Sequence, residues 1–140
     1  MISSDILRGY NDTIILGLLI REDSYGYNLM QAIADKSGGS YRMKETTLYS
    51  VLTRLEKNGL ILSYAGSETM GRKRTYYRIT PEGKTYYREK CIEWAETKQL
   101  IDRFTDLSGQ DPRPALLPEG EQPIEIDLTI ENKTAEGRKL

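Results

Sequence analysis

A chain of 140 residues with 38% hydrophobic residues and a net charge of −1 has enough apolar material for one modest core and an appendage. It contains no histidine, the commonest general base and metal ligand, and its single cysteine, Cys91, excludes an internal disulfide. We therefore predict no enzyme, no metal site and no cofactor. No apolar run approaches the roughly 18 residues of a membrane span, and no secretory signal is recognisable, so we expect a cytoplasmic protein.

The first predicted helix extends from about residue 5 to residue 21. Its run IILGLLI is apolar nearly all round, which is typical of a helix buried on more than one side. In a small domain this favours cover by a second chain, through residues such as Ile14 and Leu18. Gly9 and Gly17 lie inside the pattern and lower its helix propensity.

Two further helices are expected before residue 60. One starts near Ser24, a good N-cap, and ends at about Lys36, before the breaker sequence SGGS. The other extends from about Lys44 to Asn58 and is the second helix of a predicted helix-turn-helix. Its core face is marked by apolar residues at spacings of three and four: Leu48, Val51, Leu52 and Leu55.

The opposite face of the helix over residues 44–58 carries short hydroxyls, a tyrosine and an arginine. Such groups reach phosphates and base edges in a major groove. On the helix alone, an ordinary solvated surface explains these residue types equally well. The candidate DNA-binding residues of this helix are Lys44, Thr46, Thr47, Tyr49, Ser50, Thr53 and Arg54.

A β-hairpin is predicted directly after this helix. Gly59 ends the helix, because glycine enters the left-handed conformation without steric cost. Two strand patterns follow, from Leu60 to Tyr64 and from Arg74 to Ile79, and a glycine-containing loop joins them. Helix, stop and hairpin in this order predict a winged helix-turn-helix.

The predicted wing is strongly basic. Residues 42–78 contain eight basic and three acidic residues, a local charge of +5 in a chain whose total is −1. A basic island of this kind favours contact with nucleic acid over a scattered set of surface charges. The wing tip contributes the candidate DNA-binding residues Arg72, Lys73 and Arg74.

The last predicted helix extends from Pro81 to about Phe104. Thr80-Pro81-Glu82 is a strong helix start, with an N-cap hydroxyl, a proline and a carboxylate in order. About 24 helical residues span about 36 Å, more than the winged domain needs, so the apolar stripe of the distal half requires a partner. We predict a homodimer whose interface includes Ile14, Leu18, Tyr87, Cys91, Trp94 and Ile101.

The remaining segment, residues 106–140, is acidic. It has eight acidic and four basic residues, and its four prolines favour a linker. Residues 124–130 alternate apolar and polar, which is a strand pattern. Packing on the domain, pairing with a second copy and disorder all remain open for this segment.

Together these patterns predict an α+β, mainly α, fold. A winged helix-turn-helix occupies residues 1–80. A long C-terminal dimerisation helix follows over residues 81–105, and the acidic linker and tail occupy residues 106–140.

The sequence resembles the PadR family of bacterial transcriptional regulators, in its short subfamily with a single C-terminal helix. The resemblance extends over about residues 7–104. It is carried by the segments LRGYNDTIILGLL, DSYGYNL, TLYSVLTRLEKNGLI and GRKRTYYRITPEGK. It implies a homodimeric repressor of a palindromic double-stranded DNA operator, which dimerises through its first and last helices.

The resemblance also implies a small-molecule effector. Some short members of the family bind flat aromatic drugs between paired tryptophans of the last helix, and Trp94 occupies a similar place. Two facing indoles can hold a planar cation by stacking and cation–π attraction. The competing interpretation is that Trp94 only anchors the interface. Cys91, one turn earlier, is either a redox sensor or an ordinary buried thiol.

A function of another class competes with DNA binding. A winged-helix protein–protein adaptor that no longer binds DNA would fit the acidic tail and the low overall pI of 5.6. The basic wing argues against it. The dependence of DNA binding on salt distinguishes the two functions, because phosphate contacts release counterions.

Overall fold

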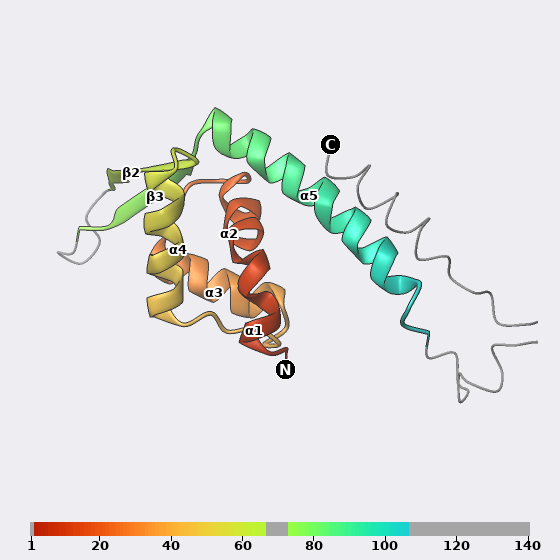
Figure 1. Cartoon of the computed structure of the whole chain (residues 1–140). Helices are drawn as coiled ribbons and strands as arrows, with labels where there is room; N and C mark the ends of the chain where they lie inside the picture. The colour runs from red at the N-terminus through yellow and green to blue at the C-terminus, as the bar shows by residue number, and fades with distance from the viewer. Residues whose placement is uncertain (1, 67–72, 107–140) are drawn as a thin grey trace, which may run out of the picture. The chain divides into compact units, whose positions relative to one another are not determined.

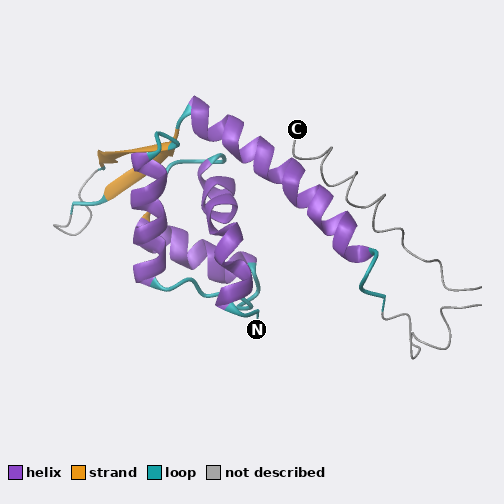
Figure 2. Cartoon of the chain, in the orientation of Figure 1, coloured by secondary structure: helices purple, strands orange, loops and turns teal. Residues whose placement is uncertain are grey.

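The computed structural model describes residues 2–66 and 73–106 of the chain. The chain falls into two units, residues 1–99 and 100–140, and the first contains the core and the sheet. Within the described ranges the fold is mainly α with one small sheet, as expected (Figures 1 and 2). In chain order the elements are α1 (Ser4–Leu7), η1 (Arg8–Tyr10), α2 (Asn11–Leu19), β1 (Ser24–Tyr25), α3 (Gly26–Lys36), α4 (Glu45–Lys57), β2 (Ile61–Ala65), β3 (Thr75–Ile79) and α5 (Pro81–Asp102).

The hydrophobic core lies between α2, α3, α4 and the inner face of the sheet. Apolar residues of α4 alternate with polar ones at helical spacing, so this helix turns one stripe inward, whereas α2 is apolar on nearly all sides. The predicted core face of α4 is confirmed, since all of its members are buried. The largest fully buried side chains are Ile15, Leu16, Leu19, Leu29, Leu48, Leu52, Leu55 and Ile61.

The helix predicted over residues 5–21 is interrupted, and this prediction was wrong. A 3₁₀ turn over Arg8–Tyr10 separates α1 from α2, and α2 ends at Leu19. Gly9 lies in the turn and lowers helix propensity there. Asn11 opens α2 with a buried side chain, whose Oδ1 accepts a 2.7 Å hydrogen bond from the Tyr41 hydroxyl. This tertiary bond sets where α2 begins.

The helix predicted from near Ser24 to about Lys36 is confirmed, but the N-cap predicted at Ser24 was wrong, since Tyr25 holds that position. Ser24 and Tyr25 form the short strand β1, which pairs antiparallel with β3, and α3 begins at Gly26. Ser24 lies opposite Tyr77 in the sheet, and its hydroxyl accepts a hydrogen bond from the Asn28 side chain. The hairpin is therefore part of a three-stranded sheet in the order β1-β3-β2.

The hairpin and the helix after it follow the sequence pattern closely. Gly59 has φ of 75°, the left-handed conformation expected after α4. Tyr77 and Ile79 of β3 are buried, whereas Arg78 between them is exposed. The Thr80 hydroxyl accepts from the Gly83 N–H at 3.0 Å, as an N-cap does. It also donates to the Gly59 carbonyl at 2.7 Å, and this joins the start of α5 to the end of α4.

The helix α5 is 22 residues long and ends at Asp102, two residues before the predicted end. From Ile92 to Gln99 its side chains are exposed, apart from a half-buried Thr97. None of the helices in the described part of the chain has both the length and the hydropathy of a membrane span. The predicted strand over residues 124–130 lies outside the described residues.

Candidate nucleic-acid interface

The outward face of α4 is polar and exposed. Thr46, Ser50 and Thr53 follow one another at spacings of four and three, so they share the face opposite the core stripe, and all three are exposed. Lys57 continues the same spacing at the C-terminal end and is also exposed. Lys57 is one of the eight basic residues of the island over residues 42–78, and the helical period also marks it as a member of this face. We call these four residues the outer face of α4.

Tyr49 lies on the flank of α4 that faces α3. A methyl group placed on Gly26 would overlap the Tyr49 hydroxyl, so this ring lies directly over the first residue of α3. Its side chain is still 43% exposed. Tyr49 therefore joins the two helices of the helix-turn-helix as well as presenting surface to solvent.

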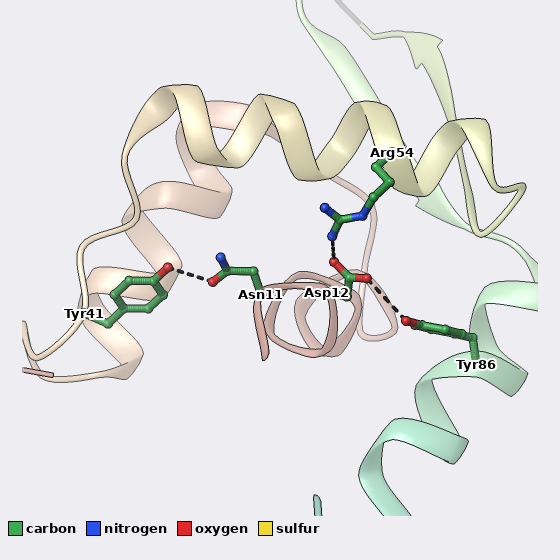
Figure 3. A network of polar contacts seen from close by, with 5 residues as sticks. All are labelled: Asn11, Asp12, Tyr41, Arg54 and Tyr86. Carbon is green, nitrogen blue, oxygen red and sulfur yellow. Dashed lines mark hydrogen bonds and ion pairs between the residues drawn. The ribbon is translucent and has the colours of Figure 1, made fainter. Parts of the chain in front are cut away.

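Arg54 lies on the other flank of α4 and is bound within the protein. Its guanidinium forms an ion pair with Asp12 of α2, and the second oxygen of Asp12 accepts a 3.3 Å hydrogen bond from the Tyr86 hydroxyl of α5 (Figure 3). Burial, and then the charge of Asp12, raise the pKa of the Tyr86 phenol, so its hydroxyl remains a donor at neutral pH. The contacts connect α4, α2 and α5 through one carboxylate.

A second cluster of polar contacts surrounds Asp23 at the base of the wing. Asp23 Oδ2 accepts from Arg78 Nε at 3.0 Å and from the Tyr64 hydroxyl at 2.5 Å. The hydrogen bond from Arg78, and then the one from Tyr64, hold the pKa of the Asp23 carboxyl below its ordinary value, against a smaller opposing effect of burial. Arg78 is thus one basic residue of the island whose charge is already neutralised within the protein.

An aromatic stack lines the outer side of the sheet. The Tyr25 ring lies 5.4 Å from Tyr76, and Tyr76 lies 5.7 Å from Tyr64, measured between ring centroids. The guanidinium of Arg74 lies 4.2 Å from the centroid of Tyr25, a cation–π distance. Arg74 is therefore held against β1, while Lys73 is exposed. Arg72, the third predicted cation of the tip, lies outside the described residues.

An apolar groove lies along α2, away from the outer face of α4. Its volume is about 480 Å³, and Ile14, Gly17, Leu18 and Tyr87 contribute to its walls. The structure thus brings three of the predicted dimer residues to one surface. The other wall residues are half apolar or aromatic and half polar or charged: Ile2, Leu7, Ile20, Ile33 and Tyr41, with Thr13, Arg21, Lys36, Ser37 and Ser40.

The other predicted dimer residues lie along α5. Trp94 is 47% exposed and packs edge-on against Tyr10 of the same chain, with ring centroids 5.2 Å apart. Cys91 is half-buried, and Ile101 is exposed in the second unit.

Comparisons with known proteins agree with this architecture. Residues 15–89 match the model of the transcriptional regulator PadR-like family. A transcriptional regulator from Clostridium thermocellum is 58% identical and superposes with a TM-score of 0.71, over 76% of this chain and all of that one. A PadR family transcription regulator from Clostridium difficile R20291 is 33% identical, with a TM-score of 0.61, over 68% of this chain and 97% of that one.

A protein of Lysinibacillus sphaericus that carries no functional description is 48% identical over 106 residues, which are 76% of this chain and 97% of its own. The family model covers more than half of this chain, and the resemblance in sequence and in structure concerns the same segment. The chain belongs to the PadR-like family of transcriptional regulators, which bind DNA.

Proposed function

We propose that the protein is a homodimeric repressor whose α4 enters the major groove of a palindromic operator. The observation that carries this proposal is the outer face of α4, where exposed hydroxyls and Lys57 stand opposite a fully buried stripe. Hydroxyl and ammonium groups on a helix of this kind suit phosphates and base edges. The wing adds further cationic residues, of which Lys73 is exposed. Such a regulator acts in the cytoplasm, where bacterial DNA lies.

The apolar groove along α2 supports the dimer. Leu18 and Ile14 are only half-buried in the single chain, and several large apolar residues of α5 are exposed, Ile92 and Trp94 among them. Exposed apolar surface of this extent is typical of a protein–protein interface. In a two-fold dimer, the two α4 helices would enter successive major grooves about 34 Å apart, one helical turn of DNA.

The wing is the part of the interface that a substitution tests most directly. We expect Arg72→Ala combined with Lys73→Ala to weaken binding to the protein's own upstream DNA by about tenfold or more. The dependence of log K on log salt should become shallower by about one for each phosphate that the variant no longer neutralises. Fluorescence anisotropy at several salt concentrations measures both quantities.

A charge-conserving variant is the matched control for the wing. Arg72→Lys combined with Lys73→Arg keeps two cations and should retain most of the affinity and the salt slope. If the alanine variant binds with unchanged affinity and slope, the wing does not contact DNA. If the unmodified protein binds its upstream DNA with no salt dependence, the adaptor function gains support and operator binding is refuted.

We further propose that a flat aromatic effector binds at Trp94 and releases the operator. Nearly half of the Trp94 side chain is exposed, which leaves part of the indole accessible to a planar ligand. Trp94 is the only tryptophan of the chain, so its emission reports the site alone. Titration with a panel of planar cationic dyes should quench it; absence of quenching throughout the panel would leave Trp94 as an interface anchor.

A further inference from the structure

We infer that a polar hollow between α4 and the segment before α2 receives a backbone phosphate of the operator, with Arg8 as one of its two cationic ligands. The inference rests on the operator binding proposed above and adds a contact from the N-terminal segment, outside the helix-turn-helix and the wing. The hollow has a volume of about 390 Å³. Its walls are formed by Arg8, Asn11, Thr46, Thr47, Ser50, Val51 and Arg54.

The lining of this hollow matches the chemistry of a phosphate. It combines two guanidinium groups, three hydroxyls and one amide, and Val51 is its single apolar residue. Guanidinium groups bind phosphate oxygens through paired N–H donors, and hydroxyls supplement them. A volume of about 390 Å³ accommodates a phosphodiester group together with hydration water.

The two arginines remain able to bind a phosphate in spite of their carboxylate partners. Arg54 donates to Asp12 through one nitrogen, Nη2, and a guanidinium has five N–H donors, so a further acceptor can be bound from the other side. Arg8 pairs with Asp5 at 2.7 Å, but both side chains are 78% exposed. An ion pair so exposed contributes little to stability, so little free energy is lost when Arg8 leaves Asp5 for a phosphate.

The start of α4 also favours an anion at this place, although its first turn already carries the carboxylate of Glu45. The N-cap residue, Lys44, makes no side-chain hydrogen bond to the first turn. The first N–H groups of a helix have no acceptor within the helix, and the dipole favours a negative charge beside them. Thr46 and Thr47 of this first turn also line the hollow.

The hollow lies at the edge of the surface that we propose to face DNA. Thr46 and Ser50 belong both to its wall and to the outer face of α4. When that face occupies a major groove, one of the two strands that border the groove therefore passes along the hollow. The phosphate contacted there would fix the register of the protein on the duplex without reading bases.

We expect Arg8→Ala to weaken binding to a duplex of upstream DNA that the unmodified protein retards, by about threefold to tenfold. The salt slope should become shallower by about one for each protomer. The loss should be the same on operator variants with altered bases, because a phosphate contact carries no sequence information. Arg8→Lys keeps a cation and should restore part of the affinity.

Two controls separate a phosphate contact from a structural role. Asp5→Asn breaks the same surface ion pair but keeps Arg8, and should leave affinity unchanged or raise it. Single phosphates replaced by neutral methylphosphonates should reveal one position in each half-site where the unmodified protein loses affinity and Arg8→Ala does not. If Arg8→Ala binds with the same affinity and the same salt slope as the unmodified protein, Arg8 does not contact a phosphate, and operator binding itself still stands. Failure of the unmodified protein to bind would refute the proposed function itself.

Discussion

Leu18→Glu should convert the protein from a dimer to a monomer and weaken operator binding by more than about 100-fold. Leu18 lies half-buried in the wall of the apolar groove along α2. A carboxylate there remains hydrated in the single chain, but it would lose its water when a second copy covers the groove, at a cost of several kcal/mol. In the dimer, the second protomer binds its half-site as an intramolecular step. Without the dimer this gain in overall affinity, a factor of about 10² or more, is lost.

Sedimentation equilibrium and fluorescence anisotropy measure the two effects of Leu18→Glu. The matched control is Leu62→Glu, which introduces the same charge at a leucine of β2 that is 41% exposed. The control should remain dimeric, since Leu62 is not among the residues that line the groove. A Leu18→Glu protein that stays dimeric at nanomolar concentration would show that the groove is not the interface.

Gly83→Ala should lower the free energy of unfolding by about 2–3 kcal/mol, although alanine is the better helix former. A methyl group on Gly83 would overlap the carbonyl oxygen of Leu60 and approach Ile79 Cγ1 at 2.7 Å. The Leu60 carbonyl is fixed by a 3.0 Å hydrogen bond from the Thr80 N–H, so it cannot move aside cheaply. The substitution must therefore displace α5 from the end of the wing.

Urea unfolding followed by circular dichroism at a fixed protein concentration measures this loss, because dimerisation shifts apparent stability. Gly9→Ala is the control. Apart from Gly9 and its two neighbours in the chain, no atom of the described residues lies within 4 Å of a methyl group built there, so stability should stay the same or rise by about 0.5 kcal/mol. A Gly83→Ala protein as stable as the parent would mean that the junction between Leu60 and α5 adapts without strain.

Local features of the fold could be predicted because each depends on neighbouring residues. The buried stripe of α4 follows from apolar spacings of three and four. The left-handed conformation of Gly59 follows from its place directly after the helix. The start of α5 follows from the order Thr80-Pro81. The hydrophobic period and the capping residues of an element can be recognised within a short stretch of sequence.

Much less of the candidate site could be predicted. The helical period separates the outer face of α4 from its core face, but it does not reveal which polar residues have partners. Arg54 had the pattern of an exposed contact residue, and only the structure shows its ion pair with Asp12. The contact of Arg74 with the Tyr25 ring could not be predicted either. Tyr25 belongs to β1, and this strand has only two residues, too few to show a strand pattern in the sequence.

The sequence by itself determined the order of the main helices and the hairpin, the two faces of α4, and membership of a winged-helix family. Only the tertiary structure decided the break before α2, the third strand, and the network of Asp12 with Arg54 and Tyr86. The physical reason is distance along the chain. Asp12 contacts partners 42 and 74 positions away in the chain. Contacts between such distant residues depend on how the whole core packs, and they produce no periodic pattern in the sequence.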